Sequence, residues 1–416
     1  MTTSASTLVA GAADCKAGNV FELDSPELRA LLDEIAAGSS EREAKRIAPY
    51  KQIRQIADAG LGRLRIPLAE GGGGVSLREL FQFLIQLAEA DSNVAHILRV
   101  HYWFVEAQLQ RPTADLRRAR HLALVNQGHI FGNGFSEQNQ RAAGLYFDTA
   151  FTPDASGRGY RLNGKKYYST GSLFSTYTAI FASPPRGTVA VAVIPVDREG
   201  VRLDDDWDGF GQRLTGTGST ILNNVFVAED EIEDFGNPDG PQPPSYQYAF
   251  LQPYLQGVAA GILRAVRNEA VALVRRRKRN FSHAQAQEPT ADPQLLQVVG
   301  EIAADAFAAE AIVLAAADVI EQAARSVKDG LPDRAPAEHA QIAAAQAKVA
   351  VDGFAHETAS RLFDAGGASA TQAMYNLDRH WRNARTASTH NPTFAKATAV
   401  GDYYVNGKAP PLNGYF

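Results

Sequence analysis

The residues best suited to chemistry stand near the C-terminus, where His390, Asn391 and Pro392 follow a stretch of alternating charge at 378–386. Proline is favoured in the first turn of a helix, so a helix is expected to begin at Pro392. His390 would then lie at the helix N-terminus, where the positive end of the helix dipole disfavours imidazolium. Because a neutral imidazole can donate, accept and transfer a proton, His390 is a candidate acid–base residue. The alternative is that it only caps the final helix.

Two other residues could join this chemistry, although neither is decisive by its position. His101 shares a predicted helix face with Ile97 and Phe104, where a histidine often serves as a hydrogen-bonded core residue. Thr170 follows aromatic residues in a predicted strand, where threonine is common. His96 lies on the same predicted helix as His101, faces elsewhere, and is interpreted as structural. A catalytic role for His101 and Thr170 therefore depends on the whole chain.

The length and composition of the chain are those of a soluble protein with more than one core. At 416 residues the chain should divide into two or three packed units. Its net charge of −5 argues against nucleic acid or an anionic membrane as a partner. Residues 1–20 are expected to be a disordered leader, without the pattern of a signal peptide. No apolar segment approaches spanning length, so a cytoplasmic protein is expected.

The first and last parts of the chain carry helical patterns. Residues 21–125 are predicted to form an N-terminal helical domain, with Ser25 capping the first helix and Ser76 to Glu79 forming a capping box. Residues 245–416 are Ala-rich with long helical segments, which predicts a closely packed helical bundle.

The middle of the chain, residues 126–235, is predicted to be a β domain because it consists of short β-rich runs. Asn163-Gly164 reads as the tight turn of a hairpin within it. A Pro/Gly/Asp-rich linker at 236–244 separates this domain from the bundle.

Four patches along the chain resemble the acyl-CoA dehydrogenase superfamily, and together they span nearly all of it. They are Pro67–Gly74, Gly132–Glu137, Leu162–Gly171 and Gly211–Ser219. The resemblance implies an α+β fold, with an N-terminal helical domain, a central β-barrel or sandwich domain and a C-terminal four-helix bundle.

Within the superfamily the chain resembles the branch of two-component flavin-dependent monooxygenases. In the dehydrogenases a carboxylate base commonly stands a few residues after an Arg-x-Ala-Arg run, and Asn391 stands at that place here. An amide cannot act as a general base at neutral pH. Some members carry the base on another helix, so an FAD-dependent acyl-CoA dehydrogenase remains the alternative. The matching stretches are Asp91–His101, Asn133–Glu137, Asp205–Trp207 and Asp378–His390.

The resemblance implies that FMNH₂, with reduced FAD as the alternative, reacts with O₂ to give a C4a-(hydro)peroxide, which donors in a dry pocket must hold. It assigns this work to His101, Thr170 and His390. Arg279 matches an arginine that reaches a flavin phosphate, often across a subunit boundary. No metal site is expected. The flavin-binding residues implied are Asn133, Ser136, Tyr168, Trp207, Thr217, Arg279 and Gly367.

The partners follow from the same comparison. No Gly-x-Gly-x-x-Gly motif is present to bind a nicotinamide dinucleotide, so a separate NAD(P)H-dependent flavin reductase is expected to supply FMNH₂. The resemblance implies a homotetramer and a small, largely apolar substrate. Sulfur oxidation is favoured, while N-hydroxylation of an amine, aromatic hydroxylation and a non-enzymatic binding protein stay open.

Three departures from the sulfur-oxidising members predict a different substrate. Thr170 replaces a serine, Ala387 replaces the first of two late histidines, and Ser369 replaces an arginine.

Overall fold

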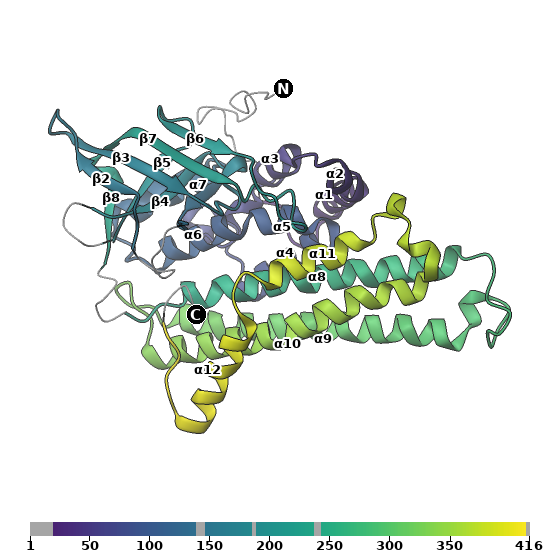
Figure 1. Ribbon diagram of the computed structural model, residues 1–416. Coiled ribbons are helices and arrows are strands. Elements are labelled where there is room, and N and C mark those ends of the chain that lie inside the picture. The colour runs from purple at the N-terminus through teal and green to yellow at the C-terminus, as the bar shows by residue number, and fades with distance from the viewer. Residues whose placement is uncertain (1–19, 139–145, 185–188, 237–242, 413–416) are drawn as a thin grey trace.

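The computed structural model describes residues 20–138, 146–184, 189–236 and 243–412. The predicted disordered leader lies almost entirely outside these residues. The chain forms an α+β fold of three parts, a helical layer, a pair of sheets and a long helical bundle, as the sequence predicted (Figure 1).

The first part is helical because its apolar residues recur at helical spacing and its ends are capped locally. Ser25 accepts a hydrogen bond from the amide of Leu28, and Ser76 forms a reciprocal capping box with Glu79, which confirms both predicted caps. The α-helices are α1 (Pro26–Ala37), α2 (Ser39–Lys45), α3 (Tyr50–Asp58), α4 (Leu77–Ala90), α5 (Ser92–Ile97), α6 (Arg99–Gln110) and α7 (Leu116–Asn126).

The division between α5 and α6 matters for the site. The sequence was interpreted as one helix across both segments, but the helix breaks at Leu98. Side chains before and after the break therefore do not follow a single helical phase. Almost every residue of the two helices is buried, so this part of the chain passes through the interior of the molecule.

The second part is a sandwich of two four-stranded sheets. One has the order β1-β4-β5-β8 and the other β2-β3-β7-β6. Leu162, Ile180, Ile194 and Val225 belong to the separate apolar core between them. The strands are β1 (Phe131–Gly134), β2 (Ala150–Pro153), β3 (Gly159–Lys166), β4 (Tyr177–Ala182), β5 (Val189–Pro195), β6 (Val201–Asp204), β7 (Ser219–Ala228) and β8 (Ile232–Gly236).

The predicted hairpin at Asn163-Gly164 is wrong. Strand β3 runs through both residues and pairs with β7, with an irregularity between Leu162 and Gly164. A Cβ at Gly164 would lie 2.3 Å from Oγ1 of Thr149, so the glycine serves a close approach and not a turn.

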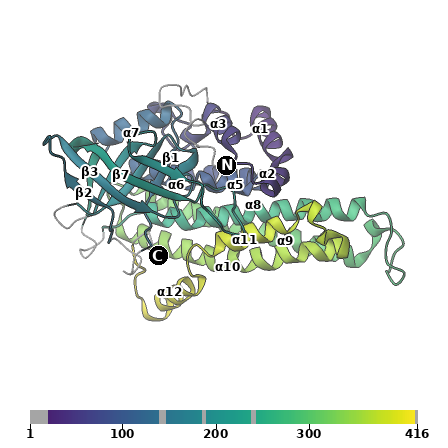
Figure 2. The ribbon, with the colours of Figure 1, turned by 45° about the horizontal axis from the view of Figure 1, so that its top comes forward.

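The third part consists of α8 (Gln247–Arg276), α9 (Pro293–Arg325), α10 (Arg334–Gly366), α11 (Asp378–Ser388) and α12 (Thr393–Asn406). Figures 1 and 2 show that α8, α9 and α10 lie side by side and project past the β domain. Helix α4 packs on α8 and α9, so the first domain and the bundle share one apolar core. Helix α11 lies against α8 and α10.

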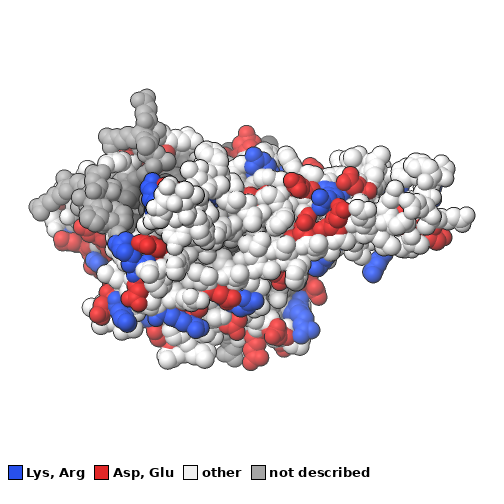
Figure 3. All heavy atoms as spheres, turned by 90° about the horizontal axis from the view of Figure 1, so that it is seen from below, with Lys and Arg blue, Asp and Glu red and all other residues white. Residues whose placement is uncertain are grey.

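The charge distribution of the surface is mixed. On the face in Figure 3, basic and acidic side chains are interspersed. Within the described ranges, none of the helices combines the length and the apolar character that a membrane span requires.

Candidate active site

The three parts of the chain meet at the loop 211–217, which follows β6. A Cβ at Gly211 would lie 2.0 Å from the carbonyl oxygen of Arg382, so α11 packs directly on the loop backbone. The amide of Gln212 donates to Oδ1 of Asn383 in α11 at 2.6 Å. The amide of Leu214 donates to Oδ1 of Asn93 in α5 at 3.1 Å. Side chains of the β domain, the first domain and the bundle therefore converge at this loop.

Three threonine hydroxyls lie together at this loop. Oγ1 of Thr217 is 2.9 Å from Oγ1 of Thr170 and 2.6 Å from Oγ1 of Thr215. Gly171 has a φ of 81° and approaches α5 so closely that a Cβ there would lie 2.5 Å from the carbonyl oxygen of Ile97. The glycine therefore brings the backbone that follows Thr170 against the end of α5.

An aromatic surface borders the hydroxyls. Tyr168 is 54% exposed and packs edge-on against Trp207, with 6.1 Å between the ring centroids. The indole N–H of Trp207 donates to the carbonyl of Gln212 at 3.0 Å, which fixes the ring to the loop. The structure thus places Tyr168, Trp207, Thr170 and Thr217 in one neighbourhood, as the expected flavin contacts require.

Asn133 and Ser136 lie beside this surface on β1 and the segment after it. The carbonyl of Asn133 accepts from the hydroxyl of Ser172, while its half-buried side-chain amide has no hydrogen-bond partner among the described residues. The carbonyl of Ser136 accepts from the amide of Tyr167. Both residues remain candidates for contacts with the edge of a ring.

His390 lies across the junction, in the turn between α11 and α12, and its tautomer is determined by its neighbours. A guanidinium has only donors, so the 3.1 Å contact of Arg99 Nη1 with His390 Nε2 makes that nitrogen the acceptor. Nδ1 then carries the proton and donates to Oδ1 of Asn391 at 2.7 Å. The surrounding protein and the cationic Arg99 lower the pKa of His390 well below its usual value, although solvent still reaches the residue. The expected neutral imidazole is therefore what the surroundings favour.

His96 is the residue that the sequence interpretation missed. It is 7% exposed, its Nδ1 has no hydrogen-bond partner, and the side chain of Gln212 lies close to it. Burial, followed by the charge of Arg99, lowers the pKa of His96 to about 3. His96 is thus a neutral imidazole beside Arg99 and His390. His96 and Arg99 are three residues apart, the spacing that places two side chains on one side of a helix, whereas His101 faces the core.

His101 occupies a different position from the one expected. Its Nε2–H donates to the carbonyl of Gly62 at 2.7 Å, and its Nδ1 accepts from the amide of Phe131 at 3.2 Å. The ring is 0% exposed and packs against Tyr102 and Phe131. Because the ring is fully buried and both nitrogens bond to fixed backbone groups, His101 is out of reach of a reacting group, whereas His390 is exposed and bonds only to side chains. His101 ties the first domain to β1.

A buried carboxylate does lie near the bundle side of the junction, but it is fully engaged. Asp352 in α10 accepts from Lys348 at 2.9 Å, from Thr393 at 2.5 Å and from Gln256 at 3.2 Å. Its oxygens are therefore already bonded to three donors within the protein. At the position where a dehydrogenase base is expected, Asn391 instead orients His390.

Arg279 and Gly367 lie far from these residues within one chain. The predicted helix through the basic run ends at Arg276, and Arg279 stands exposed in the following loop. A Cβ at Gly366 would contact Leu273, so Gly367 lies at the same end of the bundle. Leu251, which contacts Arg99, and Arg276 are separated by about 37 Å of helix α8. Arg99 and Arg279 therefore lie towards opposite ends of α8 within one copy of the chain.

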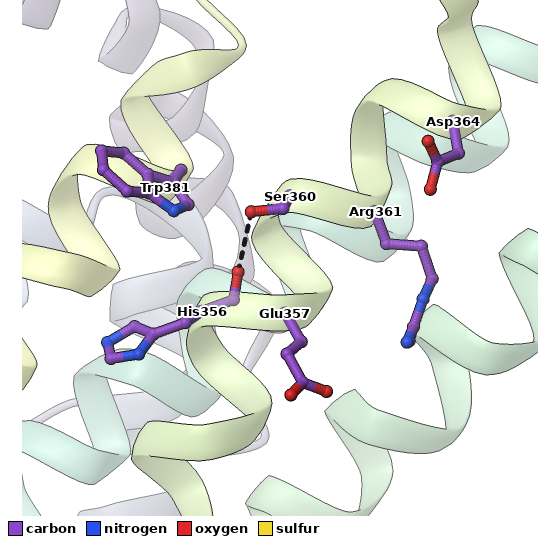
Figure 4. A pocket seen from close by; sticks show the side chains of 6 residues that line it. All are labelled: His356, Glu357, Ser360, Arg361, Asp364 and Trp381. Atoms are coloured by element: carbon purple, nitrogen blue, oxygen red, sulfur yellow. Dashed lines mark hydrogen bonds between the residues drawn. The ribbon is translucent and has the colours of Figure 1, made fainter.

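An open groove of about 570 Å³ lies between α10 and α11 (Figure 4). His356 and Ser360 face it from α10, and Trp381 lies across from them on α11. Nε2 of His356 is 2.6 Å from the hydroxyl of Ser388, which links the groove to the turn that holds His390. Because Glu357 and Asp364 also line it, the groove does not suit a phosphate by charge.

The neutral buried histidines predict a pH-dependent stability. Burial lowers the pKa of His96 to about 3, and that of His101, His121 and His380 to about 4. The unfolded chain therefore binds more protons than the folded chain below about pH 6.5. We expect the free energy of unfolding to fall as the pH drops from 6.5 towards 4, by up to about 1.4 kcal/mol per pH unit for each histidine. Urea unfolding at pH 7.5, 6.0 and 5.0 measures this, and equal stability at all three would contradict it.

The residues of the junction fit a flavin ring. A planar aromatic system with polar edges needs an aromatic wall and unused hydrogen-bonding groups, and both are present. Tyr168 and Trp207 supply the wall, while Nδ1 of His96, Oε1 of Gln212 and the Asn133 amide have no hydrogen-bond partner among the described residues.

Comparison with known proteins agrees with this geometry. Residues 27–129 match the acyl-CoA dehydrogenase N-terminal domain, and residues 255–393 match the acyl-CoA dehydrogenase C-terminal domain. The dibenzothiophene monooxygenase of Rhodococcus qingshengii is 29% identical over 403 residues, which cover 92% of this chain and 93% of that protein.

Two solved structures have the same fold over almost their whole length. FMN-bound TdsC from Paenibacillus sp. A11-2 superposes with a TM-score of 0.83 and 28% identity, covering 94% of this chain and 98% of its own. Methanesulfinate monooxygenase MsuC from Pseudomonas fluorescens superposes with a TM-score of 0.83 and 27% identity, covering 94% and 100%.

Fold and site together define a flavin-binding oxidoreductase. The chain belongs to the acyl-CoA dehydrogenase family and, within it, to the flavin-dependent monooxygenases.

Proposed function

We propose that the protein uses FMNH₂, delivered by a separate NAD(P)H-dependent reductase, and O₂ to oxygenate a small substrate at sulfur. When bound, reduced FMN supplies the two electrons that allow O₂ to be split between product and water. The observation that carries the proposal is the pairing of a neutral, oriented His390 with Asn391, in a neighbourhood whose buried carboxylate is already bound by three donors. The similarity to dibenzothiophene and methanesulfinate monooxygenases supports sulfur as the atom oxygenated.

In the proposal, three residues of this chain hydrogen-bond to the reacting oxygen or exchange a proton with it. Thr170 presents a hydroxyl that is oriented by Thr217. His96 presents Nδ1, which has no other partner. His390 holds its proton on Nδ1 and is kept neutral by its surroundings, so in the proposal it exchanges a proton with a reacting oxygen when its hydrogen bond to Arg99 or to Asn391 opens.

The flavin ring would be held by groups from the β domain. Tyr168 and Trp207 would pack against it, Thr217 would contact it beside Thr170, and Asn133 and Ser136 would contact its edge. Because Arg279 and Gly367 lie at the far end of the bundle, we propose that they bind the phosphate of a flavin in another copy of the chain. A homotetramer would supply this contact. FMN is preferred in the proposal because the similar TdsC structure holds FMN.

The proposed contact of Arg279 with a flavin in another copy of the chain leads to a quantitative prediction. Replacing Arg279 with glutamine should weaken FMN binding about 10-fold, which corresponds to the loss of one charge-assisted hydrogen bond of about 1.4 kcal/mol. Quenching of FMN fluorescence measures the affinity, and Lys278→Gln, in the same exposed loop, is the matched control. Unchanged affinity in Arg279→Gln, or full affinity in a protein that is monomeric by light scattering, would contradict the contact.

A reconstituted assay tests the function itself. The purified protein, FMN, NADH and a flavin reductase are mixed in air with methyl phenyl sulfide or benzenesulfinate, and the oxygenated product is quantified. The proposal expects product only when both reductase and protein are present. Anaerobic bleaching of bound flavin by an acyl-CoA, without reductase, would instead establish a dehydrogenase.

A further inference from the structure

We propose that Arg99 recognises a negatively charged group on the substrate, so that the substrate is a small organic anion such as a sulfinate. This inference rests on the proposed function and specifies its substrate class. It comes from Arg99, a buried arginine that has no counter-ion among the described residues.

Arg99 opens α6 and is 6% exposed. Its Nε donates to the carbonyl of Leu251 at 3.0 Å, and its Nη1 donates to Nε2 of His390 at 3.1 Å. No carboxylate within the described ranges forms an ion pair with it, and its other N–H groups have no hydrogen-bond partner there.

The remaining buried arginines show that this is unusual for the chain. Within the described residues, the other three that are less than 10% exposed each pair with a carboxylate: Arg42 with Asp91, Arg118 with Glu70 and Arg379 with Glu269. A buried charge without a partner is strongly unfavourable, whereas a paired one is tolerated. Arg99 therefore has the features of a residue whose counter-ion is a bound ligand.

The surroundings of Arg99 do not supply a hidden negative charge. Its imidazole neighbours His96 and His390 are neutral, and the charge of Asp352 is balanced by Lys348. The first peptide N–H groups of α6 add positive potential at the same place. A ligand with one negative charge would restore neutrality.

The position of Arg99 points to the substrate. His390, which shares its hydrogen bond, is reachable from solvent and is the proposed proton-handling group. A guanidinium binds two coplanar anionic oxygens with two parallel hydrogen bonds. A sulfinate presents two such oxygens, and its sulfur keeps the lone pair that is oxygenated. A neutral aromatic thioether would leave Arg99 unpaired.

The reaction balances for a sulfinate. The sulfinate RSO₂⁻, FMNH₂ and O₂ give the sulfonate RSO₃⁻, FMN and water. One oxygen atom forms a new S–O bond, the O–O bond breaks, and the other oxygen leaves as water with the two hydrogens of FMNH₂. Sulfur is oxidised by two electrons, and the flavin supplies the other two.

Binding of two nearly isosteric probes tests the inference without relying on turnover. Benzenesulfinate and neutral methyl phenyl sulfoxide are titrated calorimetrically into protein saturated with oxidised FMN. We expect the wild-type protein to bind the sulfinate at least about 30-fold more tightly than the sulfoxide. Arg99→Gln should remove this preference, Arg99→Lys should restore part of it, and Arg78→Gln, from an exposed ion pair, should leave it intact.

Equal affinity of the wild-type protein for the two probes would overturn the inference, and this comparison needs no variant that might misfold. The flavin phosphate is the other possible source of the anion. If Arg99→Gln weakens FMN but not riboflavin, and leaves the sulfinate preference unchanged, Arg99 binds the cofactor and the inference is wrong. Turnover of methyl phenyl sulfide without any sulfinate preference would leave the proposed function standing.

Discussion

Replacing His390 with alanine should lower product formation roughly 100-fold or more, while FMN binding changes little. The imidazole is held neutral and in one tautomer by Arg99 and Asn391, so it is poised to exchange a proton with a reacting oxygen. Without it, reduced flavin should still consume O₂, but the oxygen should leave as hydrogen peroxide. The ratio of product to hydrogen peroxide, measured per NADH with a saturating reductase, reports the effect.

The control for this experiment is His339→Ala, because His339 is an exposed histidine of the same bundle, on α10. It should keep the wild-type ratio. An unchanged ratio in His390→Ala, with FMN still bound, would show that His390 has no part in the reaction.

Alanine substitutions at His96 and His101 are expected to have opposite effects. His101→Ala leaves the Phe131 amide and the Gly62 carbonyl without partners and opens a cavity in the core. We expect it to lower the free energy of unfolding by about 3–5 kcal/mol. His96→Ala also opens a cavity but removes a ring whose Nδ1 has no partner, so it should cost less stability than His101→Ala and reduce product formation roughly 100-fold.

Urea unfolding and product yield per folded protein, measured on both variants, separate the two roles. Substitution by asparagine at each position provides a second, smaller polar side chain that can replace some hydrogen bonds. If His96→Ala unfolds the protein while His101→Ala stays folded and inactive, the assignment of the two histidines must be reversed.

The contrast between these histidines shows what the sequence could and could not predict. The caps at Ser25 and Ser76 were predicted because each depends on groups three residues apart. His96 was interpreted as structural because it faces away from His101, and the sequence does not show that its own side of the chain borders the junction. Asn163-Gly164 was misread as a turn because its close approach to Thr149 depends on tertiary packing.

The site was predictable only in part, for the same physical reason. The cluster of Thr170, Tyr168, Trp207 and Thr217 follows from a strand and a loop that match the family in order. The missing counter-ion of Arg99 cannot be read from its neighbours in sequence, because the groups that surround it come from α5, α8 and the turn after α11.

The position of Arg279 relative to the other predicted flavin contacts also cannot be read from the sequence. The resemblance places Arg279 on a flavin phosphate that often belongs to another subunit, and Arg279 lies beyond the end of α8. This contact stays a prediction about the assembly, which the sequence alone does not show.

A single turnover under ¹⁸O₂ tests most directly whether the protein transfers one atom of O₂ to the sulfur of its substrate. The protein is loaded anaerobically with FMNH₂ and benzenesulfinate or methyl phenyl sulfide, and then mixed with ¹⁸O₂. We expect one ¹⁸O atom per product molecule and an equal amount of oxidised FMN. Oxidation of the flavin with no labelled product from either compound, or label entering from water, would contradict it.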